Sequence, residues 1–326
     1  MESYEALRSS SAWIDLSARG KIRVLGEDRA RLLHAMSTND VNHLEPHAGL
    51  YAFFLTVQGR IFADAYIYNL GDSLFLDTEP EVGGKLRDHL DKYIIADDAT
   101  LEDESEQWAV FGIEGPQFTE AAGRLSLPIP TSAYGVAEWQ EGFVSRAAAT
   151  NRDGIRIFIP KERKQDLMRQ LDEFGIPQAS AAEAVIVRLE NGVPRYGEDI
   201  SERYLVQETQ QLQAVHTNKG CYLGQEIVER VRSRGQVHRL LMPIRVEATQ
   251  PPSPGIKFGA EGKDAGEITS AAYSPALGQV VGLAYVRTET AQAGRDLYIQ
   301  TGDGQTAVSL PARTSESALT TSERKT

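Results

Sequence analysis

Cysteine is nearly absent from this sequence: Cys221 is the single cysteine among 326 residues. One thiol cannot form an internal disulfide, which excludes a secreted fold held by disulfide bonds within the chain. The first residues, MESYEALRSSSAW, have neither the basic nor the apolar region of a secretory leader. No apolar run approaches the ~20 residues that cross a bilayer as a helix. We therefore expect a cytoplasmic protein with no membrane partner.

Basic side chains are also outnumbered, since 34 Lys and Arg residues face 46 Asp and Glu residues and the net charge is −12. Such a chain is not attracted to nucleic acid or anionic membranes in general, so we expect neither as a partner. The sequence lacks G-x-G-x-x-G, a phosphate-binding loop, H-E-x-x-H and paired C-x-x-C, and therefore predicts no nucleotide or metal site. Hydrophobic residues make up 41%, which is typical of a folded globular chain.

The first half of the chain has the pattern of an α+β fold. Residues 20–26 read as a strand and residues 27–40 as the helix that follows it. Residues 49–79 hold three β-rich runs broken by turn signals, which predicts an antiparallel meander, and residues 79–94 read as a helix weakened by two early glycines. A length of 326 residues exceeds the size of a single core, so two or three domains are expected.

A second α+β unit follows from residue 108 onward. Residues 154–160 read as a strand and residues 161–175 as an amphipathic helix closed by glycine. Ser180 and Glu183 have the spacing of a capping box, and the helix that they begin should end near Asn191. We therefore predict a main domain over 1–240, built from two lobes that divide near 100–110.

The composition changes after about residue 240. Prolines, glycines and short β-rich runs predict a small all-β domain over 241–310. The remaining residues, 311–326, are polar and without periodicity, and we expect a disordered tail.

The cysteine lies in the segment NKGCYLGQEIVERV, residues 218–231. A helix that began at Gly220 would place Cys221 in its first turn, where the helix dipole and neighbouring Lys219 would stabilise a thiolate. The alternative is a small buried hydrophobic residue, the usual setting of a free cysteine. Gly224 costs ~1 kcal/mol inside a helix, so either the helix begins later or something packs closely against it. Downstream, arginines between 230 and 239 form a local basic cluster that could bind a polyanion.

The segment KGCYLGQEIVERVRSRGQVHRLL resembles the signature of the YgfZ family of folate-binding proteins, relatives of the glycine-cleavage T-protein aminomethyltransferase. The family motif is K-G-C-[FY]-x-G-Q-E, and the matching residues are Lys219, Gly220, Cys221, Tyr222, Gly224, Gln225 and Glu226. The segments RLENGVPRYGEDISERYLVQE, LLHAMSTNDVNHL and QGRIFADAYIY are similar to further segments of the same superfamily. The resemblance implies two interwoven antiparallel α+β folate-binding lobes plus a C-terminal β-barrel around a central cavity, and it favours a monomer.

The resemblance also implies a site for tetrahydrofolate or a one-carbon derivative. Glu190 stands at the R-x-E position that holds the pterin ring in this group, and Asp64 stands where a carboxylate meets the reacting folate nitrogens. Arg188 and Tyr66 belong to the same matching segments and are assigned to the folate site with them. Ala63 replaces the second of two adjacent aspartates that T-proteins carry, which counts against aminomethyl transfer.

Three functions are consistent with these residues. The first is a folate-binding accessory protein for iron–sulfur enzymes or their assembly proteins, with Cys221 and Asp64 as the reactive groups in one cavity. There, Cys221 could supply one cluster ligand, accept a persulfide or protect a one-carbon unit. The second is a folate-dependent aminomethyltransferase or other one-carbon transferase. The third is a non-catalytic scaffold that binds a protein through the basic cluster.

Overall fold

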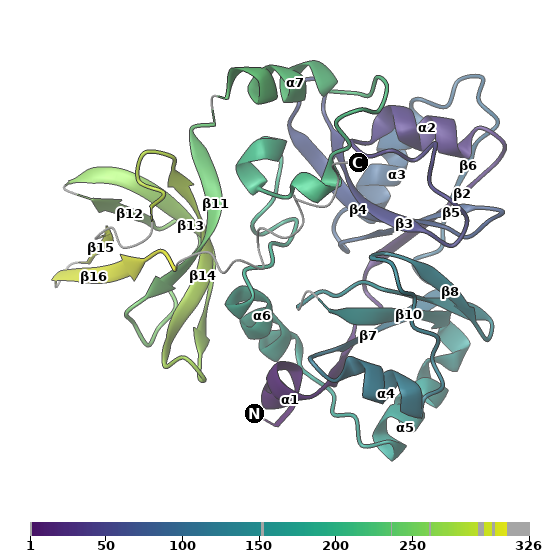
Figure 1. Ribbon diagram of the computed structural model, residues 1–326, viewed down its shortest axis with the longest axis horizontal. Coiled ribbons are helices and arrows are strands. Elements are labelled where there is room, and N and C mark those ends of the chain that lie inside the picture. The colour runs from purple at the N-terminus through teal and green to yellow at the C-terminus, as the bar shows by residue number, and fades with distance from the viewer. Residues whose placement is uncertain are drawn as a thin grey trace.

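The computed structural model describes residues 2–150, 153–235, 237–260, 262–292, 297–301 and 304–311. Within them, two five-stranded sheets and a closed barrel form three parts, which Figure 1 shows around the centre of the molecule. The predicted fold class, two interwoven α+β lobes and a C-terminal barrel, is confirmed. The predicted tail lies, apart from Pro311, outside the described residues.

The first lobe is an antiparallel sheet in the order β3, β4, β5, β2, β6. Its strands are β2 (Gly20–Leu25), β3 (Gly49–Leu55), β4 (Ile61–Asn69), β5 (Leu74–Thr78) and β6 (Thr100–Asp103). The predicted meander over 49–79 is confirmed, because β3, β4 and β5 pair in chain order. The apolar core of this lobe also contains Tyr196, Tyr222 and Val228, so the later segment with the cysteine motif packs back onto the first lobe.

Two helices of this lobe are shorter than predicted. Helix α2 (Arg29–Met36) ends at Ser37, which turns to extended backbone and forms a bridge to Phe54 beside the sheet. Helix α3 (Gly83–Asp91) begins only after the turn at 79–82, which contains Pro80. Glu79 and Glu81 therefore lie in the turn before α3, outside the helix.

The second lobe is a sheet in the order β1, β7, β10, β9, β8. Its strands are β1 (Ala12–Asp15), β7 (Trp108–Glu114), β8 (Val136–Trp139), β9 (Gly142–Ser145) and β10 (Gly154–Pro160). Its helices are α4 (Phe118–Arg124) and α5 (Lys164–Glu173), and a 3-10 turn (Lys161–Arg163) precedes α5. The strand over 154–160 and the helix before Gly175 are confirmed. Strand β1 precedes β2 in the chain but pairs with β7, which is how the two lobes interweave.

Helix α6 (Ala181–Glu190) lies between the lobes and the barrel (Figure 1). Its predicted capping box is confirmed: the Ser180 hydroxyl accepts from the Glu183 backbone N–H, and the Glu183 carboxylate accepts from the Ser180 N–H. The helix contacts both α1 (Glu2–Ser9) and the barrel. It therefore connects α1 with the barrel.

The chain passes two 3-10 turns (Val206–Thr209 and Leu212–Ala214) and helix α7 (Gln225–Arg234) before it enters the barrel. The barrel strands follow the order β11, β14, β13, β12, β15, β16, and β16 pairs with β11 to close it. They are β11 (Arg239–Val246), β12 (Lys257–Ala260), β13 (Lys263–Ser274), β14 (Gln279–Arg287), β15 (Leu297–Thr301) and β16 (Gly304–Ser309). Strands β13 and β14 face α6, which brings barrel side chains to the centre of the molecule.

Candidate functional site

A polar group of side chains lies on one face of the first sheet. Tyr51 opposes Tyr66, and Phe53 opposes Asp64, in the β3–β4 register. Directly opposed residues project to the same face, so Tyr51, Asp64 and Tyr66 gather there. The Tyr51 hydroxyl donates to Asp64 Oδ2 at 2.6 Å, and both side chains are buried. Two of the predicted site residues, Asp64 and Tyr66, are thus neighbours on one strand face.

Asp64 is a buried carboxyl that lacks a basic partner. Its side chain takes part in no ion pair with any residue that the structure describes, and only 8% of its surface is exposed. Burial, followed by the negative charge of Glu79, raises the pKa of Asp64 to about 7. Such a group takes up and releases a proton near neutral pH.

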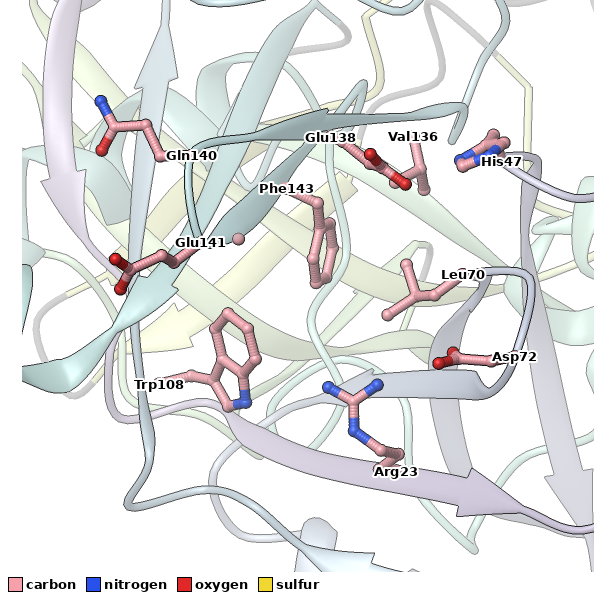
Figure 2. A pocket seen from close by; sticks show the side chains of 11 residues that line it. Arg23, His47, Leu70, Asp72, Trp108, Val136, Glu138, Gln140, Glu141 and Phe143 are labelled. Carbon is pink, nitrogen blue, oxygen red and sulfur yellow. The ribbon is translucent and has the colours of Figure 1, made fainter.

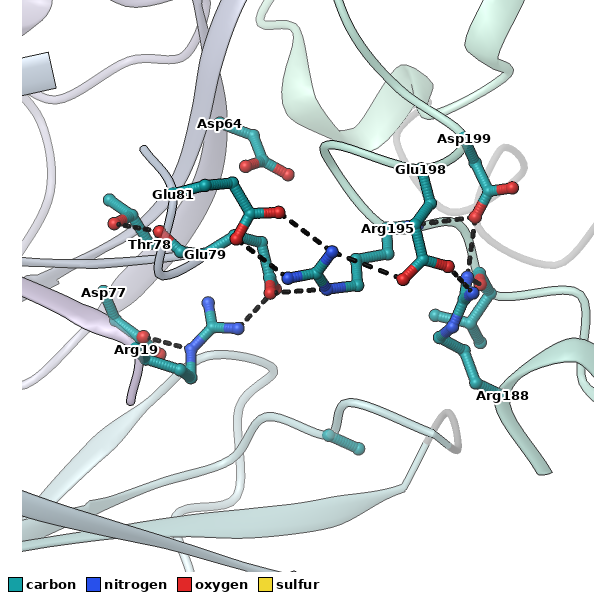
Figure 3. A network of polar contacts seen from close by, with 12 residues as sticks. Arg19, Asp64, Asp77, Thr78, Glu79, Glu81, Arg188, Arg195, Glu198 and Asp199 are labelled. Atoms are coloured by element: carbon teal, nitrogen blue, oxygen red, sulfur yellow. Dashed lines mark hydrogen bonds and ion pairs between the residues drawn. The ribbon is translucent and has the colours of Figure 1, made fainter. Parts of the chain in front are cut away.

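The arginines of this region are bound to other carboxylates (Figure 3). Arg19 is buried and pairs with Asp77 and Glu79. Arg195 donates to Glu79 at 2.9 Å and also contacts Glu81 at 2.9 Å. Although burial opposes it, these two arginines lower the pKa of Glu79, which therefore stays ionised.

Tyr66 is one of the residues of the first lobe that contact the second lobe. The Arg156 guanidinium, on β10, lies 4.2 Å from the centre of its ring and pairs with Asp77 at 2.5 Å. Tyr134, in the segment before β8, approaches the same ring at 5.5 Å between centroids. Tyr134 has a left-handed backbone with φ of 59°, a costly conformation for a bulky residue. Aromatic, acidic and basic groups from both lobes therefore surround Asp64 and Tyr66.

Arg188 and Glu190 project to different sides of α6, because residues two apart on a helix are about 200° apart around its axis. Arg188 donates to Asp199 and to Glu198, each at 2.6 Å. Asp199 in turn accepts from Thr269 and Ser270 of β13, so Arg188 belongs to the connection between α6 and the barrel.

Glu190 accepts hydrogen bonds from three donors. Tyr4 and Arg8 donate from α1, Arg8 at 2.9 Å, and Ser274 donates from β13 at 2.6 Å. The carboxylate thus joins α1, α6 and the barrel. That Glu190 holds a pterin ring stays a prediction, and a pterin would have to replace these donors.

The helix predicted from Gly220 is wrong: α7 begins at Gln225. Gly224 has φ of +81°, and a Cβ there would lie 2.7 Å from the Thr56 carbonyl, so only glycine fits this turn against β3. Cys221 therefore lies four residues before the helix, outside its first turn, and the argument for a thiolate stabilised by the helix dipole is lost. The buried alternative is wrong as well, because Cys221 is exposed.

The sequence predicts that Lys219 adds a positive charge beside the thiol, but its ammonium points to backbone carbonyls at the end of α2 instead. Its ammonium is buried and donates to the carbonyls of His34, Ser37 and Asn39, the last two at 2.6 and 2.9 Å. Burial lowers the pKa of Lys219 to about 7. Lys219 thus fastens the cysteine loop to the end of α2.

His34 lies at the same loop. A Cβ at Gly220 would be 3.9 Å from His34 Nε2, and His34 Nδ1 is 3.2 Å from Asp40 Oδ1. Burial, then the charge of Lys219, lowers the pKa of His34. The neighbourhood of Cys221 therefore contains an imidazole, but Cys221 has no hydrogen bond to it among the described contacts.

Three further residues of the cysteine motif, Tyr222, Gln225 and Glu226, lie in the core, in a turn and on the surface. Tyr222 is buried in the core of the first lobe. The Gln225 backbone N–H donates to the Tyr222 carbonyl at 3.2 Å and so completes the turn before α7. Glu226 is exposed and lies 3.8 Å from Arg230. None of the three touches Asp64 in the hydrogen bonds and ion pairs of the described residues.

The basic cluster between 230 and 239 is largely neutralised. Arg232 pairs with Glu229 at 2.6 Å, and Arg239 pairs with Glu208 at 2.9 Å. The predicted polyanion site is therefore weaker than the sequence suggests, since these carboxylates compete for the same guanidinium groups.

A cavity of about 230 Å³ lies between the two lobes, lined by residues of β2, β7, β8 and β9 and by nearby turns. Figure 2 shows the rings of Trp108 and Phe143 near the guanidinium of Arg23. Its carboxylates are Asp72, Glu138 and Glu141, which disfavour an anionic ligand. None of the predicted site residues lines this cavity.

Sequence reasoning missed four residues of the polar face: Arg19, Tyr51, Glu79 and Arg195. Strand alternation in 49–69 was a usable signal for Tyr51, because it sets Tyr51 on the face of Asp64 and Tyr66. The other three lie in turns or loops, where no periodic signal exists.

Comparison with known proteins agrees with this architecture. Residues 1–219 match the GCVT N-terminal domain, and residues 214–317 match the glycine cleavage T-protein C-terminal barrel domain. The chain belongs to the glycine cleavage T-protein family. The match establishes the superfamily that the resemblance suggested, whereas the YgfZ branch stays a prediction.

Several T-protein relatives share most of their length with the chain. It is 29% identical to an aminomethyltransferase of Rubrobacter xylanophilus over 298 residues, which cover 88% of this chain and 79% of the relative. It is 26% identical to an aminomethyltransferase of Nostoc, with coverage of 91% and 82%. Its fold is that of the glycine cleavage aminomethyltransferase T of Bartonella henselae, with a TM-score of 0.87, 19% identity and coverage of 95% and 88%.

None of the helices in the described part of the chain has the length and apolar character needed to cross a membrane. Within the same residues, no three His, Cys, Asp or Glu side chains come together as a metal site.

Proposed function

We propose that this T-protein family member binds tetrahydrofolate, or a one-carbon derivative of it, beside Asp64 and acts as a one-carbon transferase. The observation that carries the proposal is the Asp64 carboxyl itself, buried on a sheet face with Tyr51 as its donor and a pKa of about 7. The aminomethyltransferase relatives support a transferase over a purely structural role.

The residues around Asp64 fit a reduced folate. The Tyr66 and Tyr134 rings offer aromatic surface, and the guanidinium groups of Arg156 and Arg19, which are paired with Asp77, lie next to the Tyr66 ring. Tetrahydrofolate would supply the nitrogen atoms to which a one-carbon unit is attached. Asp64 would accept the proton that such a nitrogen loses when its bond to carbon forms, and would return it to the leaving group.

Ala63 distinguishes the chain from T-proteins with two adjacent aspartates, so the donor of the one-carbon unit is left open in this proposal. Calorimetry with tetrahydrofolate and a turnover assay with aminomethyl donors test it together. We expect binding by the wild type and accumulation of methylene-tetrahydrofolate. No detectable binding heat at high micromolar protein would contradict the folate part, and binding without turnover of any aminomethyl donor would contradict the aminomethyl version.

The exposure of Cys221 favours a second candidate function. A thiol on a loop that Lys219 fastens to α2 is accessible to another protein, as an accessory role toward iron–sulfur enzymes requires. A single thiolate cannot hold a cluster by itself, so partner ligands would complete it. Full complementation of an iron–sulfur enzyme defect by Cys221→Ser would exclude this function, and loss of complementation with intact folate binding would support it.

A further inference from the structure

Asp64 and Glu79 form a neighbouring pair of carboxyl groups. Strands β4 and β5 are paired so that Tyr66 lies opposite Asp77. Asp64 lies two residues from this last pair on β4, and Glu79 directly follows the end of β5, so that the charge of Glu79 acts on Asp64 (Figure 3). Two like charges this close cannot both be ionised without a cation to share.

The cations are distributed unequally between the two acids. Glu79 Oε1 accepts from Arg19 and Glu79 Oε2 from Arg195, so each of its oxygens is bound to a different guanidinium. Arg19 also pairs with Asp77, while the one side-chain donor to Asp64 among the described residues is the Tyr51 hydroxyl. Arg19 acts on Asp64 through its charge without an ion pair to it. The ionisable groups that act on Asp64 come from five segments: Tyr51 on β3, Tyr66 on β4, Glu79 after β5, Arg19 before β2 and Tyr196 after α6.

We propose that Glu79 is a positioning residue that withholds Arg19 and Arg195 from Asp64 and thereby keeps Asp64 available as a proton carrier. The place of Glu79 follows from the end of β5 and from its ion pairs with Arg19 and Arg195. Its consequence for one-carbon chemistry rests on the proposed function.

The chain offers a matched set of variants. Glu79→Gln keeps the shape and the acceptor oxygen but removes the charge, whereas Glu79→Asp keeps the charge. Glu81→Gln is the control, because Glu81 contacts the same Arg195 but is about half exposed, and the charge that acts on Asp64 is that of Glu79.

The direct readout is the titration of the Asp64 carboxyl in the folate-free protein, followed by carbon-13 NMR and assigned by its absence in Asp64→Asn. Loss of the Glu79 charge and release of the arginines both favour the ionised form of Asp64. We expect the midpoint to fall by about one pH unit or more in Glu79→Gln. It should stay at the wild-type value in Glu81→Gln and close to it in Glu79→Asp.

Equal midpoints in wild type and Glu79→Gln would overturn the proposal, and so would a Glu79→Asp midpoint as low as that of Glu79→Gln. The pH dependence of tetrahydrofolate binding provides a second readout. The pH at which affinity changes on the acidic side should shift in each variant together with the titration midpoint of Asp64. A protein that binds no folate would refute the proposed function, yet the NMR titration would still decide the role of Glu79.

Discussion

Asp64 and Cys221 both belong to the first lobe, yet their surroundings differ in almost every respect. Asp64 lies in the middle of a strand, buried, with Tyr51 as a fixed donor and Glu79 as a charged neighbour. Cys221 lies in a loop before α7, exposed and without a hydrogen bond or ion pair to any residue that the structure describes, and the loop is held by Lys219. Both residues were predicted as the reactive pair of one cavity.

The surroundings of Asp64 and of Cys221 have different consequences for what each side chain can do. The environment of Asp64 changes the chemistry of its carboxyl, because burial and a like charge favour the protonated form. The environment of Cys221 makes the thiol accessible but supplies no helix dipole and no lysine charge directed at the sulfur. Under the proposed function Asp64 is the group that takes part in chemistry, whereas Cys221 is an exposed thiol outside the polar face.

The largest expected effect is on the rate of one-carbon turnover, which should depend on Asp64 and not on Cys221. A positioned proton carrier contributes about 100-fold to 10,000-fold to a rate, so we expect Asp64→Asn to lower one-carbon turnover by at least about 100-fold. Cys221→Ser should leave turnover within about twofold, since the exposed thiol touches no residue of the polar face. A steady-state assay with both variants checks this, and the reverse ranking would invert the comparison.

The ion pairs of the polar face and those of α7 should contribute very differently to the free energy of unfolding. Arg19→Met removes the buried cation that Asp77 and Glu79 share. Because Asp77 keeps Arg156 and Glu79 keeps Arg195, we expect a loss of about 3 kcal/mol in the free energy of unfolding, the lower end for a broken buried pair. Arg232→Met removes an exposed pair on α7 and should cost at most about 0.5 kcal/mol. Urea unfolding of the two variants measures both values, and similar losses would show that the polar face is no more tightly built than α7.

The pH dependence of stability provides a third test. The pKa of Asp64 is about 7 in the folded protein against 3.8 as its ordinary value, so between these values the unfolded chain holds fewer protons than the folded one. Asp64 therefore reduces stability as pH rises from about 4 to 7, by roughly 1.4 kcal/mol per pH unit at most. We expect Asp64→Asn to be more stable than wild type at pH 8 and equal to it near pH 4. Parallel melting curves at all pH values would contradict the shifted carboxyl.

The smallest effect concerns the attachment of the cysteine loop. Lys219→Met leaves the carbonyls of His34, Ser37 and Asn39 without their shared donor, and we expect a cost of about 1–3 kcal/mol. Amide hydrogen exchange of residues 220–223 should speed up, whereas exchange in β4 should not change. A variant whose loop is as protected as in the wild type would show that Lys219 does not hold it.

The sequence predicted the fold well because strand alternation, capping and turn signals are local. The capping box at Ser180 and the meander over 49–79 were both recognised in this way. The site was harder, because Arg19, Glu79 and Arg195 come together only through sheet pairing and the return of the chain after α6. The cysteine loop was misjudged for a local reason: Gly224 in a left-handed conformation delays the start of α7.

The central claim is that a reduced folate meets the protein at Asp64. The carbon-13 signal of the Asp64 carboxyl, recorded at pH 7 while tetrahydrofolate is added, tests this most directly. We expect the signal to shift in step with folate binding and its titration midpoint to differ between the free protein and the complex. Saturable folate binding that leaves both the signal and its midpoint unchanged would contradict it.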